Sequence, residues 1–200
     1  MVPEMRSIAA ALRALADPDG PADVAPVLAV YDADPTVLVA AVEHHRLDAP
    51  FAEVLRDAGR EVPSWLSRQL ADDRVVRLRA TSALGQAAEV LDDVGVEWLA
   101  FKGPIVSALM ARPEHRSFND LDLLVAADRF AEAVGALVGH GFEELNRNWD
   151  PYVRHRIGEV PMALADVAVD LHWHVVGLGR DRRAIRFDPC LLYTSPSPRD

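Results

Sequence analysis

The chain has 200 residues, half of them hydrophobic, and a formal net charge of −10 at pH 7. This length and composition suit one ordinary domain, or a small domain with an attached helical region. The negative charge argues against broad binding to nucleic acid, because contacts with phosphates dominate that affinity. Cys190 is the one cysteine, which excludes a disulfide framework or a cysteine-based zinc site within one chain. No stretch approaches the roughly 20 apolar residues of a membrane span, and we expect a cytoplasmic protein.

The beginning of the chain is predicted to be helical, and we assign residues 1–94 to a helical N-terminal region. An Ala- and Leu-rich segment over residues 5–16 predicts the first helix. Asp34 followed by Pro35 is typical of an N-cap and a first helical position, which predicts a helix to about His45.

A short helix is predicted over residues 51–58. From Pro63 onward, apolar residues recur at spacings near three and four. This spacing predicts one long helix to about Asp93, or two helices broken near residues 72–73.

The pattern changes after Gly95, where short strands alternate with helices. Strands are predicted over 96–101, 121–125, 142–146, 159–164 and 167–175, and helices over 105–110 and 127–139. This alternation indicates an α/β or α+β core, which we assign to residues 95–189.

The end of the chain differs in composition from everything before it. Residues 190–200 read Cys-Leu-Leu-Tyr-Thr-Ser-Pro-Ser-Pro-Arg-Asp. We interpret this segment as an artefactual or disordered tail, and we expect the natural chain to continue past about Asp188, so that a C-terminal part is missing.

Three aspartates carry the strongest functional signal. Asp120 and Asp122 are two apart on a predicted strand, so their side chains point to the same face. Asp170 shares a face with His172 and His174 on another predicted strand. If the two strands are neighbours, the three carboxylates approach each other and need cations to neutralise them. Mg²⁺ is the natural ion, because it prefers carboxylates together with substrate phosphates.

A turn between a predicted strand and a helix has the features of a phosphate site. Gly103 permits a close approach of the backbone, and Lys102 can act as a point charge on a phosphate. The free N–H groups of a helix N-terminus favour anions, although Pro104 removes one donor.

Four motifs follow one another in the chain: Leu99-Ala-Phe-Lys-Gly103, Arg116-x-x-x-Asp-Leu-Asp-Leu-Leu-Val125, Gly141-Phe142 and Val169-Asp-Leu-His-Trp173. Their order resembles a family of poorly characterised bacterial nucleotidyltransferases, which looks like a branch of the DNA polymerase β-type nucleotidyltransferase superfamily. The resemblance implies an α+β fold, in which a helical N-terminal region precedes a small mixed β-sheet flanked by helices.

The resemblance also implies roles for individual residues. Asp120 and Asp122 match the metal-binding pair, and Asp170 matches the third acid, which helps to deprotonate the acceptor hydroxyl. Lys102 and Gly103 occupy the place of the superfamily's Gly-Ser turn, which holds the nucleotide phosphates. The serine of that turn is absent here. Further contacts to phosphate or substrate are expected from Ser107, Arg116 and His172.

Together these observations predict an enzyme that uses two Mg²⁺ ions to transfer a nucleoside monophosphate from a nucleoside triphosphate, such as ATP, to an unknown hydroxyl acceptor. The altered Gly-Ser turn leaves a second hypothesis open, a catalytically silent module that acts through a protein partner. A third, in which Asp170, His172 and His174 bind Zn²⁺ or Fe²⁺ in a hydrolase, has no obvious source for its remaining ligand.

Overall fold

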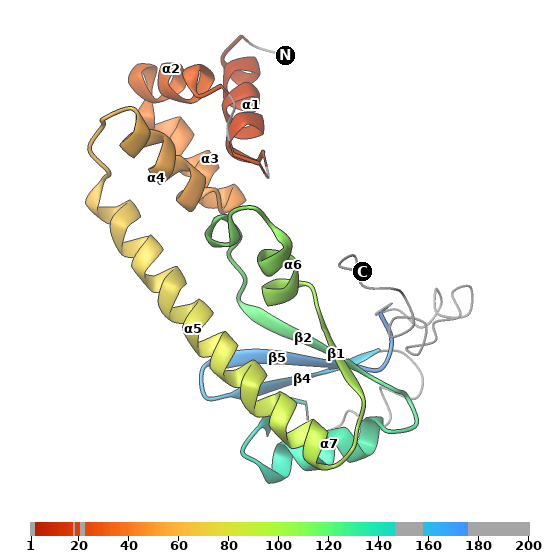
Figure 1. Cartoon of the computed structure of the whole chain (residues 1–200). Coiled ribbons are helices and arrows are strands. Elements are labelled where there is room, and N and C mark those ends of the chain that lie inside the picture. The colour runs from red at the N-terminus through yellow and green to blue at the C-terminus, as the bar shows by residue number, and fades with distance from the viewer. Residues whose placement is uncertain (1–2, 18, 21–22, 147–157, 176–200) are drawn as a thin grey trace. The chain divides into compact units, whose positions relative to one another are not determined.

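The structure is a computed structural model that describes residues 3–17, 19–20, 23–146 and 158–175 (Figure 1). The predicted tail, residues 190–200, and residues 147–157 lie outside these ranges. The chain divides into two compact units. The helical unit comprises residues 1–77 and 105–118, and the sheet unit comprises residues 78–104 and 119–200. The boundaries predicted at residues 94 and 189 stay predictions.

The helical unit is built from α1 (Pro3–Leu15), α2 (Ala25–Ala33), α3 (Pro35–His45), α4 (Asp48–Asp57) and the first half of α5 (Ser64–Asp93). It also holds most of α6 (Gly103–Leu109) and the 3₁₀ helix η1 (Pro113–His115). The predicted cap of α3 is confirmed, because the Asp34 side chain accepts a hydrogen bond from the Thr36 backbone N–H at 2.9 Å.

One helix of this unit escaped the sequence analysis. The segment of α2 reads Ala-Pro-Val-Leu-Ala-Val-Tyr-Asp-Ala, which is apolar almost throughout and shows no helical alternation of polar and apolar positions. The helix is instead stabilised by tertiary packing, since Val27 is fully buried in a core that it shares with Leu15, Leu38 and Phe51.

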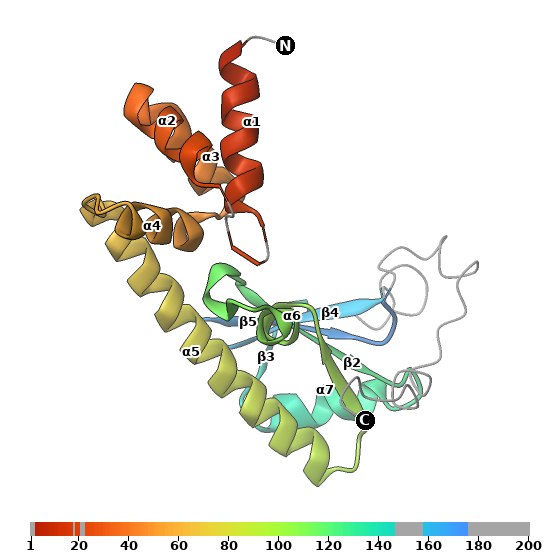
Figure 2. The ribbon, with the colours of Figure 1, turned by 45° about the horizontal axis from the view of Figure 1, so that its top comes forward.

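The described residues of the sheet unit form a mixed five-stranded sheet in the order β1-β2-β5-β4-β3. Its strands are β1 (Trp98–Phe101), β2 (Asp120–Val125), β3 (Glu143–Glu144), β4 (Glu159–Leu164) and β5 (Val167–His172). β2 and β5 pair in parallel, and the other neighbours are antiparallel. The helix α7 (Phe130–Gly139) and the second half of α5 flank the sheet (Figures 1 and 2). The predicted α+β class is therefore confirmed.

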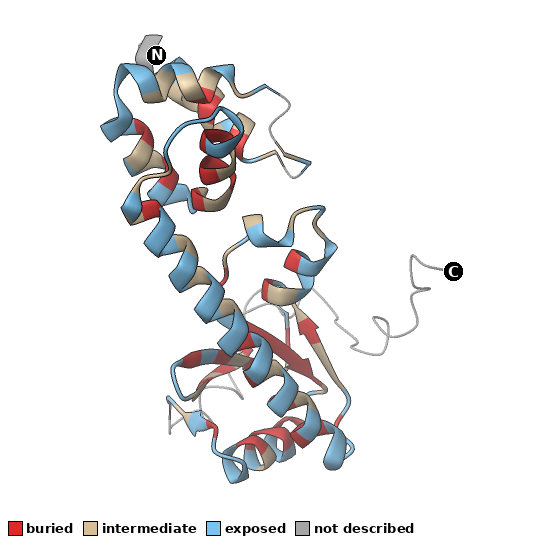
Figure 3. Ribbon diagram, turned by 60° about the vertical axis from the view of Figure 1, so that its left-hand side comes forward, coloured by how far each residue is buried: buried red, intermediate tan, exposed pale blue. Residues whose placement is uncertain are grey.

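The buried residues of the sheet are concentrated on its two central strands, β2 and β5 (Figure 3). The helix α5, by contrast, is exposed along most of its length. β2 lies between β1 and β5, and only its first residue, Asp120, is exposed. The face that carries the acids is covered as well as the apolar face, because Asp122 and Leu124 are both buried. Because both of its faces are buried, β2 is more enclosed than the half-polar pattern of its sequence indicates.

The last strand is shorter than predicted. We expected it to run to Val175, but β5 ends at His172. The backbone N–H groups of Trp173 and His174 both donate to the Gly158 carbonyl, at 2.8 and 3.2 Å, so the chain leaves the regular ladder there. No helix among the described residues combines the length and the apolar character needed to cross a membrane.

Candidate metal-binding site

The register between β2 and β5 brings two predicted acids together. Asp122 is the direct cross-strand partner of Asp170, and in a parallel pair such partners project to the same face of the sheet. His172 follows two residues after Asp170 and therefore shares that face. The condition on which the metal prediction depended, that the two strands are neighbours, is met.

The three side chains form a compact set of ligand atoms. One oxygen of Asp122, one oxygen of Asp170 and one ring nitrogen of His172 all lie within 4.8 Å of one another. Asp122 and His172 are buried, with 4% and 3% of their surfaces exposed, and Asp170 is half-buried. Two carboxylates suit hard divalent cations such as Mg²⁺ and Mn²⁺, and an imidazole also suits Zn²⁺ or Fe²⁺. The residues present therefore fit a divalent metal ion.

His172 is held from both sides by carboxylates. Its Nε2 lies 3.0 Å from Asp122 Oδ1, and its Nδ1 lies 3.1 Å from Glu159 Oε2. The second contact has the distance of an ion pair without the angles of a hydrogen bond. The ring of Phe101 packs edge-on against the imidazole, with 4.9 Å between the ring centroids. These contacts fix the orientation of the imidazole.

Glu159 is the residue of this site that the sequence analysis missed. It opens β4 and is the antiparallel partner of His172. In the sequence, Glu159 was visible only as an acid at the start of a predicted strand. This position became informative once the register of the β4–β5 hairpin was known. A carboxylate behind a metal-ligating histidine is a common way to orient the ring.

Lys102 approaches the same carboxylate from the end of β1. Its Nζ donates to Asp122 Oδ1 at 2.6 Å and lies 5.0 Å from the centroid of the Phe101 ring. Lys102 adopts a left-handed backbone conformation with φ 61°, and Gly103 follows with φ 28°. This conformation is uncommon for a residue other than glycine, and here it forms the turn from β1 into α6. Lys102 is the single lysine of the sequence.

The pKa values of these groups follow from their contacts. Burial raises the pKa of Asp122, but hydrogen bonds from His172 and Lys102 outweigh burial and hold the pKa below its usual value. The same hydrogen bond to Asp122 raises the pKa of Lys102. Burial, followed by the charge of Glu159, raises the pKa of Asp170. The two neighbouring acids thus differ in character, one stabilised as a carboxylate and the other inclined to hold a proton.

Three of the predicted site residues are not among the converging ligand atoms of this cluster. Asp120 is exposed at the start of β2 and is not among the converging ligand atoms. Ser107 and Arg116 belong to the helical unit. The Ser107 hydroxyl donates to the Pro113 carbonyl at 2.7 Å and accepts from Arg77 Nη1 at 2.7 Å. The phosphate contacts expected of Ser107 and Arg116, and the metal contact expected of Asp120, stay predictions.

The set proposed for a zinc or iron hydrolase is not assembled as a whole. Asp170 and His172 converge, whereas His174 lies beyond the end of β5 and is not among the converging ligand atoms of the described residues.

Comparison with known proteins gives one family. A family model described as "Uncharacterised nucleotidyltransferase" matches residues 31–197, and the match includes all the residues of the cluster. No curated protein matches the chain.

Proposed function

The chain belongs to this uncharacterised nucleotidyltransferase family, and from that membership we propose that it transfers a nucleoside monophosphate group from a nucleoside triphosphate to a hydroxyl acceptor. Asp122 and Asp170 hold Mg²⁺ in this proposal, and Asp120, on the same strand as Asp122, serves a second ion. The observation that carries the proposal is the pairing of Asp122 with Asp170 across two parallel strands, beside His172.

The reaction needs positioning and charge neutralisation more than covalent catalysis. The acceptor hydroxyl oxygen attacks the α-phosphorus, the bond from that phosphorus to the bridging oxygen of the β-phosphate breaks, and pyrophosphate leaves. Bound Mg²⁺ would supply positive charge to the phosphates and polarise the attacking hydroxyl.

The residues of the chain divide the remaining work. Asp170 accepts the proton of the acceptor hydroxyl at a carboxylate oxygen, the role that the family resemblance implies for the third acid. Lys102 is half-exposed on a turn next to the cluster, and its ammonium group is the proposed contact to the triphosphate. His172 and Glu159 keep the ligand atoms in position.

The test is binding of Mg²⁺ and ATP, measured by isothermal titration calorimetry, in the wild type and in Asp122→Asn and Asp170→Asn variants. Each substitution removes a charge from the cluster and is expected to weaken binding of Mg²⁺-ATP at least tenfold. Asp128→Asn changes an exposed acid of the sheet unit outside the cluster and is expected to bind as the wild type does. Equal binding by all four proteins would refute the assignment of the site.

A second candidate, a catalytically silent module that binds a protein partner, is favoured by one observation. Lys102 gives Asp122 an internal cation at 2.6 Å, so the buried carboxylate has a partner within the chain itself. The two candidates differ in the calorimetric experiment, because a silent module of this kind binds neither metal nor nucleotide at the cluster.

A further inference from the structure

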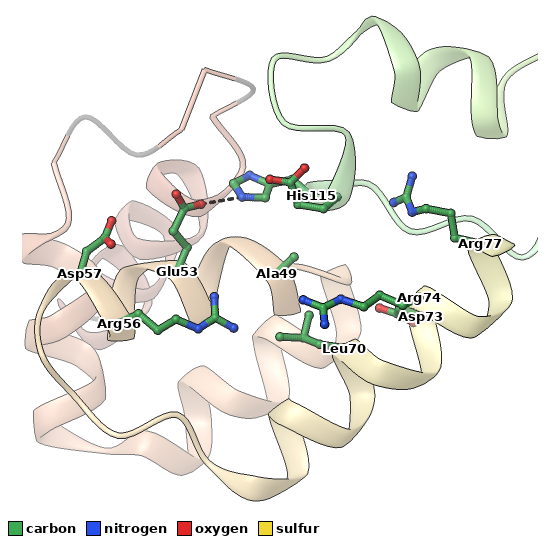
Figure 4. A pocket seen from close by; sticks show the side chains of 10 residues that line it. Ala49, Glu53, Arg56, Asp57, Leu70, Asp73, Arg74, Arg77 and His115 are labelled. Atoms are coloured by element: carbon green, nitrogen blue, oxygen red, sulfur yellow. Dashed lines mark hydrogen bonds and ion pairs between the residues drawn. The ribbon is translucent and has the colours of Figure 1, made fainter.

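A pocket in the helical unit is lined by none of the residues to which the proposed transfer reaction assigns a role. Side chains of α4, η1 and the first half of α5 line a cavity of about 450 Å³. Ala49 and Leu70 give it an apolar floor. Figure 4 shows Arg56 on α4 and Arg74 on α5 with their guanidinium groups turned toward each other across this floor.

Neither guanidinium group has a counter-ion in the part of the chain that the structure describes. Glu53, one helical turn before Arg56, would be its natural partner. Glu53 is instead engaged by Arg112 and by His115, whose Nε2 lies 2.7 Å from Glu53 Oε2. Asp73, next to Arg74, accepts from the Gln69 side-chain amide at 3.2 Å. Two like charges that converge without a carboxylate between them favour an anion in that place.

The donors indicate which anion fits. Two planar guanidinium forks offer two positive charges and several N–H groups, which match the charge and the three terminal oxygens of a phosphate monoester. Besides Glu53 and Asp73, whose carboxylates have the partners given above, Asp57 and Glu114 line the cavity. The carboxylates of Asp57 and Glu114 repel long polyanions and accept hydrogen bonds from hydroxyl groups. The apolar floor adds a surface for a ring.

We propose that this pocket binds a small phosphate monoester whose other end carries hydroxyl groups, the chemistry of a sugar phosphate. Arg56 and Arg74 hold the phosphate from two helices, and the acids of the cavity wall select against nucleoside triphosphates and nucleic acid. The proposal depends on the helical unit alone and is independent of nucleotidyl transfer.

The test is a titration of the full chain without metal, followed by the backbone amide signals in ¹H–¹⁵N correlation spectra. Glucose 6-phosphate is expected to shift signals of α4 and of the first half of α5. Inorganic phosphate is expected to shift the same signals with weaker affinity, and glucose alone is expected to leave them in place. ATP is expected to bind there more weakly than glucose 6-phosphate.

Three variants test the assignment of the arginines. R56Q and R74Q each remove a charged hydrogen-bond donor and are expected to weaken binding of glucose 6-phosphate tenfold or more. R68Q changes an exposed arginine of α5 outside the pocket and is expected to bind as the wild type does. The proposal is overturned if glucose 6-phosphate and phosphate both fail to bind, if R56Q and R74Q keep full affinity, or if R68Q loses as much. Tighter binding of ATP or of phosphate alone would overturn the sugar phosphate assignment.

Discussion

Replacing Lys102 by methionine should change the affinities for metal and for nucleotide in opposite directions. The substitution keeps most of the length of the side chain and removes the ammonium group 2.6 Å from Asp122 Oδ1. That ammonium competes with a metal ion for the carboxylate, but it also offers a positive charge to a triphosphate. In K102M, we therefore expect Mn²⁺ to bind more tightly and ATP to bind more weakly.

The expected change in affinity depends on how far solvent screens the ion pair between Lys102 and Asp122. Coulomb's law at an effective dielectric constant of 20 would give about 4 kcal/mol for a close pair. The Lys102 side chain is 57% exposed, so solvent screens most of this energy. We take about 1 kcal/mol, the upper range for exposed pairs, which corresponds to about fivefold in affinity.

The assay is calorimetric titration with Mn²⁺ alone, and then with ATP at saturating Mn²⁺. R79M is the matched control, because Arg79 forms an ion pair with Asp166 in the same unit and its side chain is 55% exposed. Weaker binding of Mn²⁺ by K102M than by the wild type, or an equal gain of affinity in R79M, would refute competition between Lys102 and the metal ion.

Three further substitutions test other contacts. E159Q should weaken Mn²⁺ binding about tenfold, because it removes the charge that orients His172. D48N should raise the free energy of unfolding at pH 7 by on the order of 1 kcal/mol, and give no gain below pH 3.8 in chemical denaturation. Burial raises the pKa of Asp48, so its contribution to stability is present in acid and is lost as the pH rises through its pKa in the folded state. R77M should lower the free energy of unfolding by about 2–3 kcal/mol, because Arg77 donates to Ser107 Oγ and two backbone carbonyls.

A specific outcome would contradict each of these three predictions. E143Q, on the neighbouring strand β3, should bind Mn²⁺ as the wild type does, and equal affinities in E159Q and E143Q would remove Glu159 from the site. A gain in D48N that persists unchanged in acid would mean that ionisation is not its cause. An R77M variant within about 0.5 kcal/mol of the wild type would mean that its hydrogen bonds contribute little.

The acids were predictable because strand alternation is a local property. Asp122 and Asp170 could be assigned to polar faces from their own neighbours in sequence. The pairing of their strands stayed a condition until the structure showed it. Glu159 could not be found in the same way. Its place beside His172 depends on the register of the β4–β5 hairpin, which is set by pairing across the sheet rather than by the residues around Glu159.

The contact of Lys102 with Asp122 could not be predicted from the sequence either. The position of Lys102 before Gly103 indicated a phosphate contact, but its contact with Asp122 depends on a left-handed backbone that propensity does not predict for lysine. The helix α2 was missed for another reason. Its residues are apolar on nearly all sides, and periodicity gives no signal where the polar positions are absent.

The central claim, that Asp122 and Asp170 hold a divalent metal beside Lys102, can be tested with the single lysine of the chain. Reductive methylation with ¹³C labels Lys102 and the N-terminal amine, and keeps their charge. Paramagnetic Mn²⁺ at the cluster should broaden the Lys102 signal beyond detection at about one equivalent, and excess Mg²⁺ should restore that signal by competition. A Lys102 signal that survives saturating Mn²⁺, or that is lost equally in Asp122→Asn and Asp170→Asn variants, would contradict the claim.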